Sequence, residues 1–196
     1  MNEMPWGQFF GLLFMTMGPI RAIAVFSRVG ESDDAPRVRA LATESAGLVA
    51  GAYLLAVFVG NGALNAWGVS FPVLIGAAGV ALFALSLQAL LTPVGPSTQL
   101  DPERTPAAAI AFPGLFPPIA VTVPLIFSVP FPGLGIKLGI IALGLSLIGV
   151  NWLLMLKSKA ILNAVGPVPL QLFGAVFGVL QLALALQFIV SAMAML

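Results

Sequence analysis

Met17-Gly18-Pro19-Ile20-Arg21 interrupts the first long apolar run of the chain. Proline inside a helix removes a backbone hydrogen bond and clashes with the preceding turn, so this stretch predicts a broken helix. If the run crosses a lipid bilayer, the freed backbone groups are tolerated only where protein or a water-filled cavity surrounds them. The arginine that follows costs about 2.5–3.5 kcal/mol to insert near the centre of such a helix. A break and a charge at one place predict a functional site.

The composition indicates a membrane protein. Of the 196 residues, 60% are hydrophobic and 8% are charged, and the mean hydropathy is +1.09. Soluble domains carry about 25% charged residues, so this chain cannot cover a soluble surface. Its apolar residues come in long runs without alternation, which predicts an all-α membrane protein rather than a β-barrel.

Missing residue types exclude several kinds of chemistry. The chain has no Cys and no His, which excludes disulfides, thiol redox chemistry, and metal sites or general bases built on His. Intramembrane hydrolysis would need a nucleophile–base or Asp pair, and the apolar runs supply neither. A net charge of +1 does not indicate the basic surface that nucleic-acid binding requires. We therefore expect no enzyme activity and no cofactor or metal. The expected partners are the lipid bilayer and a small-molecule substrate.

Six apolar runs are long enough to span a bilayer. They cover residues 6–27, 37–60, 71–91, 107–128, 136–156 and 170–196. The residues before the first run carry Glu3 and no Lys or Arg, unlike a secretory signal, so we expect this helix to be retained. The prediction is one membrane domain in three parts: a first three-helix repeat (1–92), a cytoplasmic linker (93–106) and a second three-helix repeat (107–196).

Basic residues predict how the chain crosses the membrane. The first, third and fifth loops lie on one side of the predicted bundle and carry most of the basic residues, whereas the other side carries Lys137 alone. The basic residues of the odd-numbered loops are Arg28, Arg37, Arg39, Arg104, Lys157 and Lys159. By the positive-inside rule, the odd-numbered loops are cytoplasmic and both termini lie outside.

A second break matches the first. The fourth run is interrupted by Pro113-Gly114 and again by Pro117-Pro118-Ile119, which aligns with Gly18-Pro19-Ile20. Each half holds an odd number of spans, so the second half enters the membrane from the other side, which predicts an inverted repeat. Each break lies roughly 12 residues, or about 18 Å, into its span, near the middle of a ~30 Å hydrocarbon core. Two ordinary proline kinks are the alternative.

Two half-helix N-termini would then face each other near the bilayer centre. Their free N–H groups and positive dipole ends favour an anionic group such as a carboxylate. Arg21 adds a full positive charge there, but an ion pair or gate with Glu44 is an alternative role for it. The predicted substrate site comprises Gly18, Pro19, Ile20, Arg21, Pro117, Pro118, Ile119 and Thr122.

Small and polar residues in the spans predict helix packing. Gly174 and Gly178 have a G-x-x-x-G spacing, and Gly76 and Gly79 belong to a small-residue patch. Either pair packs within the chain or between the subunits of a homo-oligomer. Interhelical hydrogen bonds are expected for most of the polar residues in the spans, which are Thr16, Thr43, Ser45, Gln88, Thr122, Asn151, Gln181 and Gln187.

The six-span layout and the two breaks resemble the MarC family, also called the neutral amino acid transporter family, over nearly the whole chain. The first-span motif of that family falls on residues 18–26, where Pro19, Ile20 and Phe26 match. The first part of its fourth-span motif meets Pro113-Gly114-Leu115-Phe116-Pro117, and Val121-Thr122-Val123 replaces the glycine-proline part that follows. The resemblance implies a multi-pass protein of a bacterial or archaeal inner membrane, related more distantly to the LysE exporters.

The chain departs from this family pattern in charge. Gly18 and Gln88 stand where the family carries acidic residues. The chain therefore looks like a divergent member in which intramembrane negative charge has been exchanged for the positive charge of Arg21.

The leading hypothesis is a secondary transporter or exporter of a small solute that carries a carboxylate, such as an amino acid or a related organic acid. Alternating access would expose the site between the two breaks to each side in turn. The alternatives are an uncoupled channel and a structural or regulatory membrane protein without transport.

Overall fold

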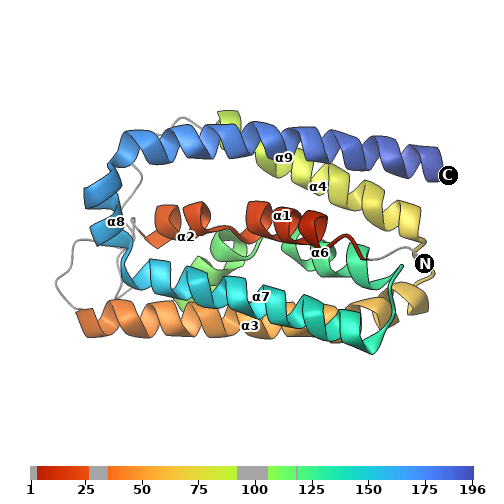
Figure 1. The fold of residues 1–196 in the computed structure, drawn as a ribbon, viewed down its shortest axis with the longest axis horizontal. Coiled ribbons are helices and arrows are strands. Elements are labelled where there is room, and N and C mark those ends of the chain that lie inside the picture. The colour runs from red at the N-terminus through yellow and green to blue at the C-terminus, as the bar shows by residue number, and fades with distance from the viewer. Residues whose placement is uncertain (1–3, 27–34, 92–105, 118) are drawn as a thin grey trace.

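The computed structural model describes residues 4–26, 35–91, 106–117 and 119–196, and every element in these ranges is a helix. Four long helices run along one common direction (Figure 1): α3 (Ala35–Ala66), α4 (Phe71–Leu91), α7 (Leu134–Leu156) and α9 (Pro167–Met195). Each contains a stretch that is long and apolar enough to cross a membrane. The predicted all-α membrane protein is confirmed.

The two other predicted spans are divided into short helices. The first consists of α1 (Trp6–Met17) and α2 (Pro19–Phe26), which follow one another along the bundle (Figure 1). The second consists of α5 (Ala107–Ala109), the π-helix η1 (Ile110–Leu115) and α6 (Ile119–Ser128). At 1.5 Å per residue, α1 and α2 are about 18 Å and about 12 Å long, so only together do they match a ~30 Å core.

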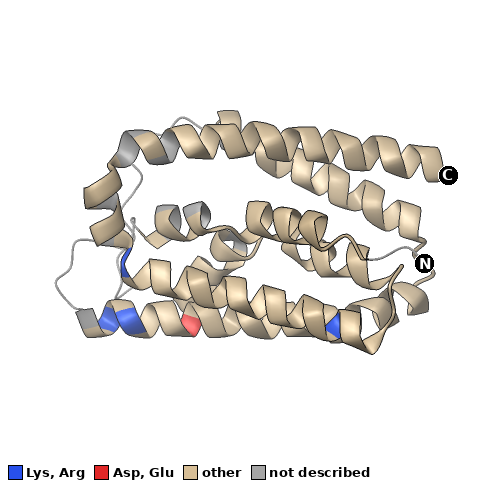
Figure 2. Cartoon of the chain, in the orientation of Figure 1, with Lys and Arg blue, Asp and Glu red and all other residues tan. Residues whose placement is uncertain are grey.

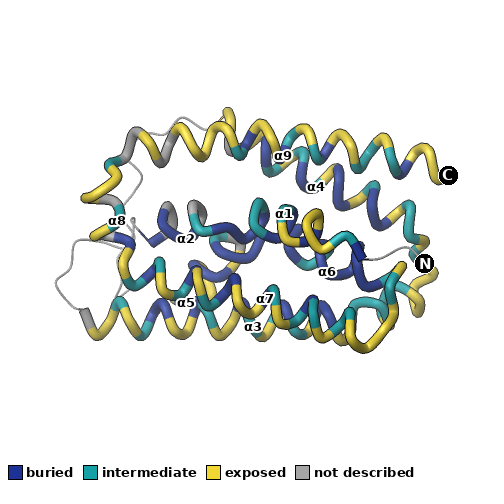
Figure 3. Tube along the Cα trace, viewed as in Figure 1, coloured by how far each residue is buried: buried dark blue, intermediate teal, exposed yellow. Residues whose placement is uncertain are grey.

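The short helices form the centre of the bundle. Figure 3 shows mostly buried residues along α6 and along the second half of α1, whereas the outer helices alternate between buried and exposed positions. The most extensive contact between two helices joins α4 and α9, while α3 and α7 pack together and enclose the centre from another side. Large apolar side chains such as Leu55 and Leu172 remain exposed on the outer helices, as expected for surfaces that contact lipid.

Helix α3 extends six residues beyond its predicted end, so the prediction of a loop beginning at residue 61 was wrong. Gly60 does not end the helix because it makes room for Leu125 of α6, which a Cβ at this position would approach to 2.3 Å. The helix ends instead before Gly68, whose φ of +66° is the left-handed conformation that glycine adopts after a helix C-terminus. The N–H of Val69 donates to the carbonyl of Leu64 across this turn at 2.9 Å.

The prediction of a loop at 157–169 was also wrong, because most of this basic segment forms the helix α8 (Ser158–Val165). Gly166, with a φ of +78°, separates α8 from α9, and Pro167 opens α9 at a position where its missing N–H costs nothing. The predicted first loop (28–36) lies mostly outside the described residues, and so does nearly all of the 93–106 linker.

The charge asymmetry predicted along the chain is also present in space (Figure 2). Arg37 and Arg39 lie in the first turns of α3, and Lys157 follows α7. The start of α3 and the end of α7 lie at one end of the bundle, opposite the start of α1 and the end of α9. Lys137, in the first turn of α7, lies near that opposite end.

Candidate functional site

The first helix is interrupted at Gly18, where the sequence predicted a break. Gly18 ends α1 in an extended conformation (φ −70°, ψ 167°), and α2 begins at the next residue. A Cβ on Gly18 would lie 1.9 Å from the carbonyl oxygen of Phe14, which is backbone and cannot move aside. The backbone path through the break therefore requires glycine.

Pro19 has no N–H, so the carbonyl of Met15, four residues earlier, loses its helical partner. The side-chain amide of Gln181 in α9 donates a hydrogen bond to this carbonyl. Gln181 is about nine-tenths buried, and without this donor the part-buried carbonyl of Met15 would be left unpaired. A side chain from the last helix thus compensates the break in the first.

A second amide acts on the same break. Asn151 in α7 is 6% exposed, and its Nδ2 donates to the carbonyl of Met17, the last residue of α1. Its other amide atom, Oδ1, is buried and has no hydrogen-bond partner in the described part of the chain. The predicted interhelical hydrogen bonds of Asn151 and Gln181 are confirmed, but the sequence did not show that their acceptors belong to the break.

Among the other polar residues of the spans, some form hydrogen bonds between helices and others form them within one helix. Ser45 bonds between helices, since its hydroxyl donates to the carbonyl of Ala107 at 3.3 Å. Thr43 accepts from the indole N–H of Trp152 at 3.2 Å. Thr16, Thr122 and Gln187 instead donate hydrogen bonds within their own helices.

The second break has a different form. Within η1, Phe112 has non-helical angles (φ −126°, ψ 125°), and the N–H of Phe116 donates to the carbonyl of Ala111 at 2.8 Å, five residues back. The α-helix resumes at Ile119, and the N–H of Ala120 donates to the carbonyl of Pro117 at 2.8 Å. π-Helical turns are rare and often occur at functional sites.

The two broken segments run antiparallel. α1 packs against α6, and α2 packs against η1, so the first piece of one segment lies beside the last piece of the other. The rings of Phe9 and Phe127 meet edge to face across the α1–α6 contact, with centroids 5.2 Å apart. This pairing brings the N-terminus of α2 and the N-terminus of α6 to the same central region of the bundle.

The described residues among those predicted to bind substrate lie around these N-termini. Gly18, Pro117 and Ile119 are buried, and Pro19 and Thr122 are half-buried. The hydroxyl of Thr122 donates to the carbonyl of Ile119 at 2.7 Å, within its own helix. Pro118 and the side chains of Ile20 and Arg21 lie outside the described part of the structure.

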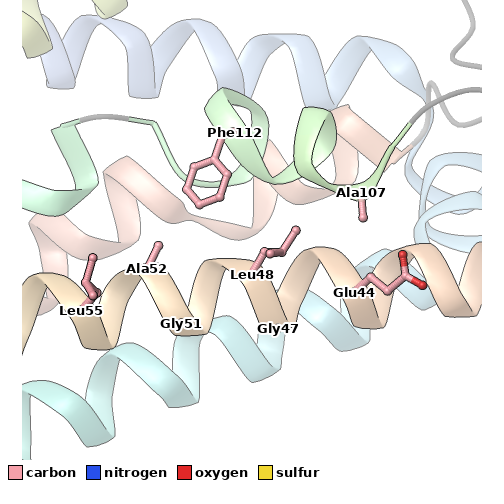
Figure 4. A pocket seen from close by; sticks show the side chains of 8 residues that line it. All are labelled: Glu44, Gly47, Leu48, Gly51, Ala52, Leu55, Ala107 and Phe112. Carbon is pink, nitrogen blue, oxygen red and sulfur yellow. The ribbon is translucent and has the colours of Figure 1, made fainter.

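Glu44 lies on a different surface. It is exposed on α3 and lines a groove of about 730 Å³ that α3 forms with α5 and η1 (Figure 4). Gly47 and Gly51 have no side chains to fill the groove on its α3 side, and Phe112 projects from η1 towards α3. The side chain of Arg21 lies outside the described part of the structure, so the Arg21–Glu44 pair remains a prediction. The four-residue spacing of Gly47 and Gly51 was the sequence signal for this groove, and it was missed.

One protein family matches the chain from residue 5 to residue 196, and it is described as the MarC family of integral membrane proteins. The chain belongs to the MarC family. A search of curated proteins and a search of solved structures return no match.

In this MarC protein, three of the four glycines predicted to support helix packing lie against a neighbouring helix. Gly76 and Gly79 face α9, where a Cβ on Gly79 would approach the backbone of Ala185 and Ile189 to 3.0 Å. Gly178 faces the side chain of Leu90 in α4. Gly174 is exposed, and no described atom lies within 4 Å of where its Cβ would be.

Proposed function

We propose that this chain is a secondary transporter or exporter of a small solute that carries a carboxylate, bound between the N-termini of α2 and α6. The observation that carries the proposal is the antiparallel pairing of two broken segments at the centre of an apolar bundle. Discontinuous helices at the interface of inverted repeats are where many secondary transporters bind their substrates. Membership of the MarC family agrees with a membrane protein of this kind.

The chemistry of the two N-termini favours an anion. The first N–H groups of each helix have no partner within the helix, and the helix dipole places partial positive charge there. Arg21, in the first turn of α2, adds a full charge at the same end of that helix. A carboxylate satisfies both requirements.

Alternating access fits the burial of the break. Gly18 and Pro117 are buried, so a solute reaches them only when the surrounding helices move apart. The breaks separate each segment into two pieces that can tilt independently, which is the kind of element such a motion needs. In this proposal the chain is a multi-pass protein of a bacterial or archaeal inner membrane. Both termini lie outside and the odd-numbered loops are cytoplasmic.

Reconstitution into liposomes tests the proposal. Labelled amino acids and organic acids are supplied as a panel, and saturable uptake or exchange of at least one of them is expected. Arg21→Ala should lower that flux strongly, whereas Arg37→Ala, at the exposed start of α3, should change it little. Absence of flux for the whole panel, with wild type equal to Arg21→Ala, would overturn the proposal. Flux linear in concentration without counter-transport would instead indicate an uncoupled channel.

A further inference from the structure

The unpaired oxygen of Asn151 marks a second position at the first break. Within the described part of the chain, Asn151 Oδ1 is the only buried side-chain polar atom without a hydrogen-bond partner. Its orientation is fixed by chemistry, because the amide nitrogen donates to the carbonyl of Met17. Exchanging the two amide atoms would place two acceptors against each other. The oxygen is therefore the atom of the amide that lacks a hydrogen-bond donor or another positive partner.

The helix end beside this oxygen favours positive charge. Asn151 is bonded to the last carbonyl of α1, and the C-terminal end of a helix carries roughly half a negative elementary charge. The last turn of a helix also leaves carbonyls without helical partners. At this break, Gln181 and Asn151 each supply a donor to one of them. An added acceptor oxygen at such an end attracts a hydrogen-bond donor or a cation and disfavours an anion.

We propose that Asn151 Oδ1 and the carbonyl end of α1 bind a small monovalent cation, with Na⁺ as the representative. Hard cations prefer oxygen ligands, and the C-terminal ends of broken transmembrane helices coordinate Na⁺ in transporters. A divalent ion is disfavoured because the described residues contain no group of three or more His, Cys, Asp or Glu side chains. Neutral oxygens suit a single charge.

This cation would lie close to the proposed solute. α1 ends at Met17 and α2 begins at Pro19, so the cation-attracting and anion-attracting helix ends are two residues apart. A cation at one end strengthens the attraction of the other for a carboxylate, and the linkage is reciprocal. The role of the cation as a coupling ion rests on the proposed transport function, whereas its binding does not.

The experiment measures cation binding without any solute. The purified full chain is titrated with NaCl at constant ionic strength, with N-methylglucamine chloride as the balance, and its Tm is followed by tryptophan fluorescence. A saturable rise in Tm with Na⁺ is expected. Asn151→Leu should abolish the rise. Gln187→Leu is the matched control, because it removes an exposed amide from α9 that bonds only to Ser191, and it should retain the rise.

Asn151→Asp provides an independent reading if Asn151→Leu does not fold. A full negative charge at this position should lower the half-saturating Na⁺ concentration about tenfold or more. The inference is overturned if wild type shows no rise specific to Na⁺, or if folded Asn151→Leu keeps it. An unchanged half-saturation in Asn151→Asp also overturns it, and so does a response to ammonium but not to Na⁺.

Failure of this inference is distinguishable from failure of the proposed function. An intact Na⁺ response without flux of any solute in liposomes would overturn the proposed transport function and support the cation site. Solute flux that is the same in Na⁺ and in N-methylglucamine, together with no rise of Tm in Na⁺, would overturn the cation site and leave the proposed transport function standing.

Discussion

The side-chain amide of Gln181 donates a hydrogen bond to the carbonyl oxygen of Met15, the carbonyl that Pro19 leaves without a helical partner. The two residues are 166 positions apart in the chain. A break in a membrane helix is tolerated when neighbouring helices satisfy the freed backbone groups. Here α9 and α7 supply the donors, so the break is a supported feature of the fold rather than a local irregularity.

Replacing Gln181 by Leu should destabilise the folded protein. The substitution leaves the part-buried Met15 carbonyl unpaired, which costs about 1–3 kcal/mol. Gln187→Leu is the matched control on the same helix, because Gln187 is exposed and bonds only to Ser191 four residues on. Thermal unfolding in detergent should show a clear loss of Tm for Gln181→Leu and little change for Gln187→Leu. Equal losses would contradict the role assigned to Gln181.

Gly18→Ala should disrupt the first break. The added Cβ would lie 1.9 Å from the Phe14 carbonyl oxygen, so the backbone must shift, and overpacking of this kind costs about 1–3 kcal/mol. Gly11→Ala in the same helix has no described atom within 4 Å and should be neutral or stabilising by about 0.5–1 kcal/mol. The Tm difference between the two variants measures the effect. A Gly18→Ala protein as stable as Gly11→Ala would show that the backbone takes another path.

The sequence predicted the features of the fold that depend on local chemistry. The helix break follows from Gly18-Pro19, because proline lacks an N–H wherever it occurs. The long outer helices follow from their apolar runs. The end of α3 was misplaced because Gly60 resembles a helix end, and only the contact with Leu125 of α6 shows why a glycine stands inside the helix.

The support of the break could not be predicted because it depends on contacts between distant helices. Asn151 and Gln181 were expected to bond between helices, but a sequence does not show which carbonyl each amide will reach. The ion pair between Arg21 and Glu44 stays a prediction, because the side chain of Arg21 lies outside the described part of the structure. In the structure Glu44 lines a groove with Ala107 and Phe112.

Gly144→Ala should weaken the contact between α3 and α7. Tyr53 is fully buried, and its hydroxyl donates to the carbonyl of Ile140 at 2.8 Å. A Cβ on Gly144 would lie 2.2 Å from Cζ of that ring, so the ring must move and its hydrogen bond must lengthen or break. We expect a loss of about 1–3 kcal/mol in unfolding free energy. Gly149→Ala on the same helix, with open space at its Cβ, should show no such loss, and a loss of the same size would contradict this packing.

The proposed orientation predicts which end of the bundle faces the cytoplasm. The chain has no cysteine, so single introduced cysteines report sidedness without background labelling. Trp67, in the turn after α3, is 79% exposed and lies at the end of the bundle where α9 finishes, whereas Lys157 is exposed at the opposite end. A membrane-impermeant maleimide should label Trp67→Cys in intact cells and Lys157→Cys only after permeabilisation. The physical reason is the positive-inside rule acting on the basic residues that gather around Lys157 and the start of α3. The parent protein without cysteine is the control, and labelling of Lys157→Cys in intact cells would reverse the orientation.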